Sequence, residues 1–115
     1  MAGSNKEVVG YWSAVSLAAN KTGDSVELRH VSSGTVEVVW ADATATDAVV
    51  KLQESVNGAW FDIASQTVTI SAATGTKLFK LTRDILLSPM IRAVLTKNTE
   101  TTGTVTISYF FKGDR

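Results

Sequence analysis

The chain has 115 residues, of which 44% are hydrophobic, enough for one domain that buries its own core without cross-links. It contains no cysteine, which excludes disulfides, thiolate metal sites and cysteine nucleophiles. Eleven basic residues balance eleven acidic ones, and this zero net charge argues against nucleic-acid binding, because phosphate neutralisation requires a basic excess. We therefore expect a single domain over residues 1–115.

No apolar run follows a basic region at the N-terminus, so we expect no secretory signal, and no stretch of the chain approaches the ~20 apolar residues of a membrane helix. We expect residues 1–6 to form an N-terminal arm, followed by a strand over residues 8–17. Tyr11 and Trp12 are adjacent in that strand, so the alternation of side chains predicts that they point to opposite faces. At least one of these rings should then lie outside the core.

The middle of the chain alternates between apolar and polar residues with a period of two, which predicts short strands. We expect these strands over residues 25–31, 35–40, 48–55, 60–63, 67–70 and 77–81. In the first of them, His30 shares a face with Val26 and Leu28. Asn57-Gly58 predicts a tight hairpin turn, because both residues tolerate positive φ. Between two of the strands, residues 41–48 are expected to form a single helical turn.

The C-terminal third predicts one helical turn over residues 82–88, ended by Pro89, and two further strands over 89–97 and 104–111. The last strand places four apolar residues on one face (Val105, Ile107, Tyr109 and Phe111). Phe110 falls on the other face, among threonine and serine side chains. A large aromatic ring on that face is a candidate for a protein interface.

Eight or nine short strands with turn residues between them are typical of an antiparallel β-sandwich. We therefore predict an all-β, jelly-roll-like sandwich with at most one or two helical turns. The order of the strands stays open, because it depends on long-range pairing. The candidate interface residues are Tyr11, Trp12 and Phe110.

No catalytic, cofactor or metal site is predicted. His30 is the only histidine, and no motif places a serine and an acid beside it, so we expect a structural residue at or near a sheet edge. Zinc requires more histidine or thiolate ligands than the chain has. The loop aspartates lack calcium-binding spacing and are expected to cap turns (Asp24, Asp42, Asp47 and Asp114).

Three tryptophans leave open a role in carbohydrate binding, because a sugar ring can stack on an indole face. Trp40 ends an inward-facing series of residues, which favours a place in the core. We expect at least two of the three tryptophans to be structural. Trp60, just after the hairpin turn, is the candidate for stacking on a sugar.

The segment from Leu52 to Ile63, with Asn57-Gly58 followed by Trp60, resembles a hairpin of small phage virion proteins and of discoidin-like or galactose-binding-like sandwiches. Met90 to Leu95 resembles a later strand of these proteins, and the likeness extends from Asp47 to Lys112. The chain departs from the secreted discoidin-like members, which often carry a cysteine pair and a signal peptide.

This resemblance implies a non-catalytic phage virion protein, such as a capsid decoration or a head- or tail-associated subunit. Such a protein is assembled in the host cytoplasm, forms homo-oligomers and contacts other virion proteins, without nucleic acid, membrane or cofactor. The alternative is a carbohydrate-binding module for host adhesion. A small hydrolase built on His30 is the third hypothesis.

Overall fold

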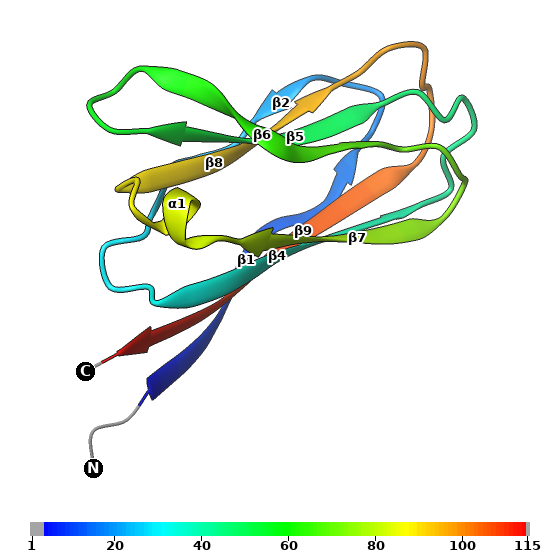
Figure 1. The fold of residues 1–115 in the computed structure, drawn as a ribbon. Helices are drawn as coiled ribbons and strands as arrows, with labels where there is room; N and C mark the ends of the chain where they lie inside the picture. The colour runs from blue at the N-terminus through cyan, green and yellow to red at the C-terminus, as the bar shows by residue number, and fades with distance from the viewer. Residues whose placement is uncertain (1–3, 115) are drawn as a thin grey trace.

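The computed structural model describes residues 4–114, and it describes side chains from Val8 to Gly113. Two antiparallel sheets pack face to face, and a single helical turn lies at one edge (Figure 1). The elements in chain order are β1 (Ser4–Ser16), β2 (Lys21–Thr22), β3 (Val26–Glu27), β4 (Ser33–Ala41), β5 (Val49–Ser55), β6 (Trp60–Thr69), β7 (Gly75–Leu81), α1 (Arg83–Leu86), β8 (Met90–Thr96) and β9 (Thr104–Asp114).

The strand order is that of a jelly roll. The terminal sheet, named here for the first and last strands that it contains, has the order β1-β9-β4-β7. The internal sheet has the order β2-β8-β5-β6, and β3 also pairs with β8. All connections except β2–β3 and β5–β6 thus cross between the sheets, and the prediction of an antiparallel jelly-roll-like sandwich is confirmed.

The core lies between the sheets and is built from the inward side of each strand. Val36, Val38 and Trp40 of β4 are buried, as are Ile91, Ala93 and Leu95 of β8, and the four apolar residues of β9. These are the alternating positions that the sequence predicts, because a period of two places every second side chain on one face of a strand. Each fully buried large apolar side chain contributes about 1.5–3 kcal/mol.

Two predicted elements are wrong. The strand expected over residues 25–31 ends at Glu27, because the chain turns where the Val31 N–H donates to the Leu28 carbonyl at 3.0 Å. His30 lies exposed in that turn and not on a strand face with Leu28. No helical turn forms over residues 41–48 either; this loop instead wraps around the carboxylate of Glu100.

The strands predicted over residues 60–63 and 67–70 are two parts of one strand, β6. The register steps from Gln53–Asp62 to Lys51–Thr67, so extra residues bulge from β6 between these pairs. Ser65, at φ 66°, takes the left-handed conformation that this irregularity requires. The gap in the predicted pattern marks the bulge and not a turn.

The ends of β1 and β9 run together past the rest of the sandwich (Figure 1). Residues 4–6 of the predicted N-terminal arm belong to β1, and residues 1–3 lie outside the described residues. The molecule measures 48 × 30 × 20 Å along its principal axes. Within residues 4–114, α1 is a single turn, and no helix has the length and apolarity to cross a membrane.

Candidate protein interaction surface

Tyr11 and Trp12 both turn toward the interior, so the prediction that they point to opposite faces is wrong. The pairing of β1 with β9 shifts between Gly10–Ser108 and Trp12–Ile107, which leaves Tyr11 as an extra residue. Such a bulge breaks the alternation of side chains. The two rings stack with their centroids 5.5 Å apart, and Trp12 is only 4% exposed. Trp12 is therefore a core residue.

The Tyr11 hydroxyl joins the two sheets at an edge of the sandwich. Oη donates to the Asp24 carbonyl oxygen at 2.5 Å and accepts from the Ala93 N–H at 3.3 Å. This contact fills the break between β2 and β3, which are two pieces of one edge strand beside β8. Burial raises the pKa of Tyr11, although the hydrogen bond from Ala93 acts in the opposite direction. The phenol acts as a structural link.

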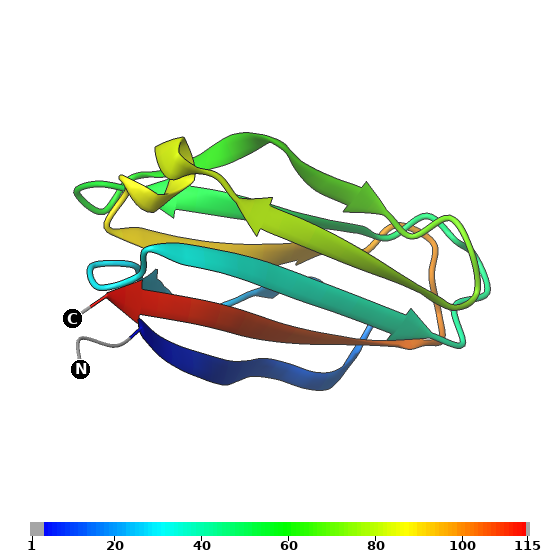
Figure 2. The ribbon, with the colours of Figure 1, turned by 60° about the horizontal axis from the view of Figure 1, so that its bottom comes forward.

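Phe110 lies on the outer face of the terminal sheet, the face that the sequence predicts for it. The register aligns one residue from each strand in a row across this face: Val8, Phe110, Thr35 and Lys80. The next row along the strands consists of Gly10, Ser108, Glu37 and Leu78. Figure 2 shows the terminal sheet turned forward, with its strands side by side.

Exposed apolar side chains gather on this outer face. Four of the large hydrophobic residues with high exposure lie on it: Val8 (66%), Leu78 (46%), Phe110 (40%) and Val39 (36%). We call this surface the outer apolar face. Single exposed apolar residues are common, but several on one sheet face make that face a candidate interaction site.

A shallow hollow of about 470 Å³ lies at one end of the outer apolar face. Val8, Thr35 and Phe110 line it with apolar atoms, while Lys80 and Lys112 add positive charge. Glu37 contributes a carboxylate from the neighbouring row. The face thus combines an exposed aromatic ring, an apolar hollow and charges of both signs, features that occur at protein–protein interfaces.

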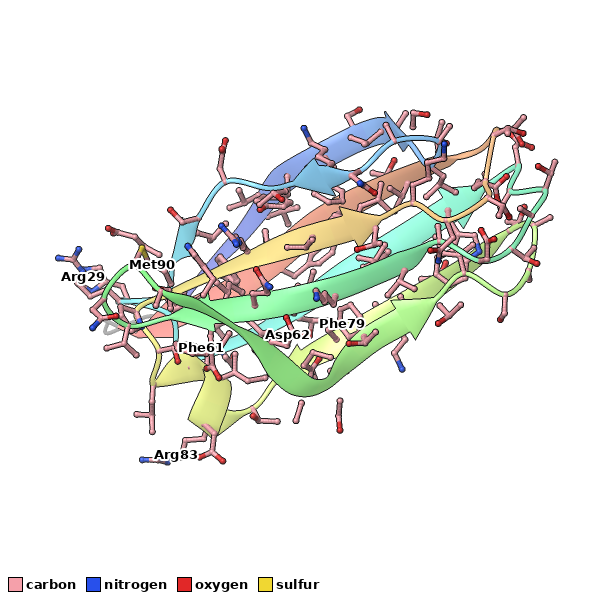
Figure 3. The ribbon with its side chains drawn as sticks, turned by 90° about the horizontal axis from the view of Figure 1, so that it is seen from above. Arg29, Phe61, Asp62, Phe79, Arg83 and Met90 are labelled. Carbon is pink, nitrogen blue, oxygen red and sulfur yellow. The ribbon has the colours of Figure 1, made fainter. Side chains whose placement is uncertain are left out.

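The internal sheet presents a different, polar outer face, seen from above in Figure 3. The Arg92 guanidinium lies 4.2 Å from the centroid of the Trp60 ring, and Arg92 Nε donates to Gln53 Oε1 at 2.9 Å. Gln53 Nε2 and Lys51 Nζ donate to the Asp62 carboxylate at 2.8 and 3.1 Å, and these hydrogen bonds lower the pKa of Asp62. Trp60 is half-buried, with Arg92 over its ring.

His30 and the loop aspartates named in the sequence analysis do not form a shared site in the structure. His30 is exposed in its turn, and among the described residues no three acidic or histidine side chains are placed to hold a metal ion. Asp47 fastens its loop by accepting from the Thr99 N–H at 3.0 Å. Asp24 and Asp42 are exposed in loops, and the side chain of Asp114 lies outside those described.

Glu100 is a structural residue that sequence reasoning missed. Its buried carboxylate accepts from the backbone N–H groups of Thr44, Ala45 and Thr46 at 2.9–3.2 Å, and from Thr44 Oγ1 at 2.8 Å. Burial raises the pKa of Glu100, but these hydrogen bonds outweigh it and lower the pKa to about 2. An acid within a threonine-rich loop gives no sequence signal for this role, because the donors lie 54–56 positions earlier.

The chain matches no protein-family profile and no curated protein sequence. Solved structures do share its fold. The SPBc2 prophage-derived protein YomS is 10% identical with a TM-score of 0.63, over 98% of this chain and 97% of that one. The VP2 subviral particle of infectious bursal disease virus is 8% identical with a TM-score of 0.58, over 96% of this chain and 33% of VP2. The structure of the Gx strain of that virus is 7% identical with a TM-score of 0.56, over 95% of this chain and 32% of that one.

The structural neighbours of this chain therefore include a prophage-derived protein and the VP2 subviral particle of a virus. At these identities the likeness concerns the fold alone. The chain spans about a third of the VP2 chain but nearly all of YomS. The suggested relation to discoidin-like sandwiches finds no confirmation in these three structures.

Proposed function

We propose that this protein is a non-catalytic structural subunit of a phage virion, either a capsid decoration or a head- or tail-associated subunit. The observation that carries the proposal is the outer apolar face of the terminal sheet, centred on the exposed ring of Phe110. A flat apolar face on a rigid sandwich serves contacts between proteins, since it offers area without a cleft in which titratable groups converge. The jelly-roll strand order, which is common among viral capsid proteins, supports the proposal.

The hydrogen-bonded loops at one end of the sandwich also support a structural role. Glu100 and Asp47 hold the loop between β4 and β5 against the loop between β8 and β9. The backbone N–H groups that surround Glu100 are therefore already occupied by the protein itself. Ordered loops suit a subunit that must present one fixed surface to its neighbours.

The test is incorporation into particles. Particles from the phage that encodes the chain are purified and searched by mass spectrometry, and the gene is then replaced by a Phe110→Asp variant. We expect the wild-type chain at a fixed copy number per particle and at least a tenfold loss for the variant. Particles that lack the wild-type chain would refute the proposal.

Carbohydrate binding is the second candidate function, because Trp60 is an aromatic ring on an otherwise polar sheet face. The Arg92 guanidinium lies over that ring, so a sugar has to use the other side of the indole or displace Arg92. A glycan array tests this candidate. A hit that Trp60→Ala abolishes supports it, and a blank array removes it.

A further inference from the structure

We propose that the outer apolar face of the terminal sheet packs against the same face of a second copy of this chain, in a two-fold symmetric dimer. The proposal rests on the function proposed above and names the partner of that surface. It follows from three features of the face. The exposed ring of Phe110 lies beside a low strip at Gly10 and Ser108, Glu37 and Lys80 carry opposite charges one row apart, and the area of the face is close to what a dimer buries.

The ring and the empty position are complementary. Phe110 is 40% exposed in one row of the face, while the next row contains Gly10 and Ser108, whose small side chains leave a low strip beside it. A Cβ added at Gly10 meets no atom within 4 Å, so space is open above this glycine. A knob beside a hole on one surface is self-complementary, because a two-fold axis brings each knob to the partner's hole.

The charges fit the same arrangement. A two-fold axis that runs across the strands, between the row of Phe110 and the row of Gly10, places Phe110 of each copy over Ser108 of the other and Val8 of each copy over the open space at Gly10. The same axis places Glu37 over Thr35 of the other copy, one strand away from Lys80. Opposite charges then meet twice, once on each side of the axis. The two sheets stay nearly aligned, as in the packing inside a sandwich.

The area is sufficient for a stable dimer. Four strands about 4.8 Å apart and roughly nine residues long, at about 3.3 Å per residue, present a face of roughly 20 × 30 Å. Side chains make the accessible area of such a face larger than these ~600 Å² of flat surface, and a standard interface buries about 800 Å² per partner. The zero net charge of the chain removes long-range repulsion between copies.

Sedimentation velocity over a broad concentration range tests the proposal. We expect the wild-type protein to dimerise, and both Phe110→Asp and Gly10→Arg to weaken the dimer by about 30-fold or more, the effect of losing an interface hot spot. Gly10→Arg fills the hole without disturbing the fold, since its Cβ has free space. The matched control is Phe61→Asp, because Phe61 is 63% exposed on β6 of the other sheet and this change should leave the dimer intact. Near-UV circular dichroism verifies that each variant is folded.

Charge exchange tests the orientation. Glu37→Lys and Lys80→Glu should each weaken the dimer by about fivefold, and the double variant should recover most of the loss, because the pair is restored with its signs reversed. A monomeric wild type, or a folded Phe110→Asp variant that still dimerises, overturns the proposal. A monomer that is nevertheless found in particles overturns this inference and leaves the proposed function standing. A wild-type chain that dimerises but is absent from particles overturns the proposed function and leaves this inference standing.

Discussion

Two tyrosines that touch each other have opposite hydrogen-bonding situations in this protein. Tyr11 and Tyr109 meet edge to face with ring centroids 4.9 Å apart. The Tyr11 hydroxyl bonds to Asp24 and Ala93, whereas the buried Tyr109 hydroxyl has no partner among the described residues. A buried hydroxyl without a partner costs free energy, and a satisfied one that joins two sheets stabilises them.

The same change at the two tyrosines should therefore have opposite effects. Tyr11→Phe removes the bond to Asp24 and leaves the Ala93 N–H without its acceptor, so we expect a loss of about 1–3 kcal/mol in the free energy of unfolding. Tyr109→Phe removes only an unsatisfied hydroxyl, and the stability should stay the same or rise by about 1 kcal/mol. Urea unfolding followed by tryptophan fluorescence measures both values. An equal loss in both variants would contradict this account.

Gly23 provides a second test of the same link. A Cβ at this position falls 1.8 Å from the Tyr11 hydroxyl, so the tyrosine has to move out of the break between β2 and β3. We expect Gly23→Ala to destabilise the protein by about 1–3 kcal/mol, the usual cost of overpacking a well-filled site. In a Tyr11→Ala background the loss from Gly23→Ala should be smaller, because the hydroxyl and the ring atoms that lie 1.8–2.6 Å from the added Cβ are gone; a double-mutant cycle measures the difference.

Glu100 makes the stability depend on acid pH. Its pKa is lowered to about 2 in the folded protein, from an ordinary value of 4.5, so folding favours the charged form. The stabilisation is fully present above pH 4.5 and is lost as the pH falls through about 2. Glu100→Gln should be less stable than wild type at neutral pH, and the gap should close on acidification. Thermal unfolding at several pH values measures the gap, and Glu27→Gln on the exposed surface serves as the control.

The strands follow from local sequence, while their irregularities do not. The alternation in β4, β8 and β9 predicts the buried residues correctly, including Phe110 on the outer side of β9. The bulge at Tyr11 leaves no local signal, because it depends on the pairing of β1 with β9, about 95 positions away in sequence. Sequence alternation therefore places Tyr11 and Trp12 on opposite faces, whereas both rings turn toward the interior.

The loops at the two ends of the sandwich should tolerate insertions differently. The hairpin between β5 and β6 is exposed at Asn57 and Gly58, and doubling its length costs only about 0.6 kcal/mol in loop-closure entropy. The same insertion between Ala45 and Thr46 separates two N–H groups that hold Glu100.

We expect a four-residue glycine–serine insertion after Asn57 to leave the urea midpoint nearly unchanged, and the same insertion after Ala45 to lower it clearly. Equal midpoints for the two insertions would mean that the contacts of Glu100 do not stabilise the loop. The hairpin position is also the better place for a label in the particle experiments, since it lies in a loop and not on the outer apolar face.

At the scale of the whole molecule, the sequence predicts the class of fold and part of the candidate surface. The number and pattern of strands indicate a sandwich, but the strand order requires pairs such as β1 with β9, which no local pattern encodes. The same limit applies to the outer apolar face. Phe110 is predictable by itself, whereas its row with Val8, Thr35 and Lys80 exists only after four distant segments have paired.

The position of β9 makes folding depend on the C-terminal segment. This strand lies between β1 and β4 in the terminal sheet, and it carries the buried residues Val105, Ile107 and Tyr109. A chain that ends at residue 103 loses both sets of ladder hydrogen bonds and exposes the inner face of the internal sheet. Because a domain of this size has only about 5–15 kcal/mol of stability, the remaining strands cannot compensate. We expect the truncated chain to lack a cooperative thermal transition by circular dichroism and to bind a dye for exposed apolar surface. A cooperative transition in that chain would mean that the internal sheet folds independently, and the jelly roll would then be two separable layers.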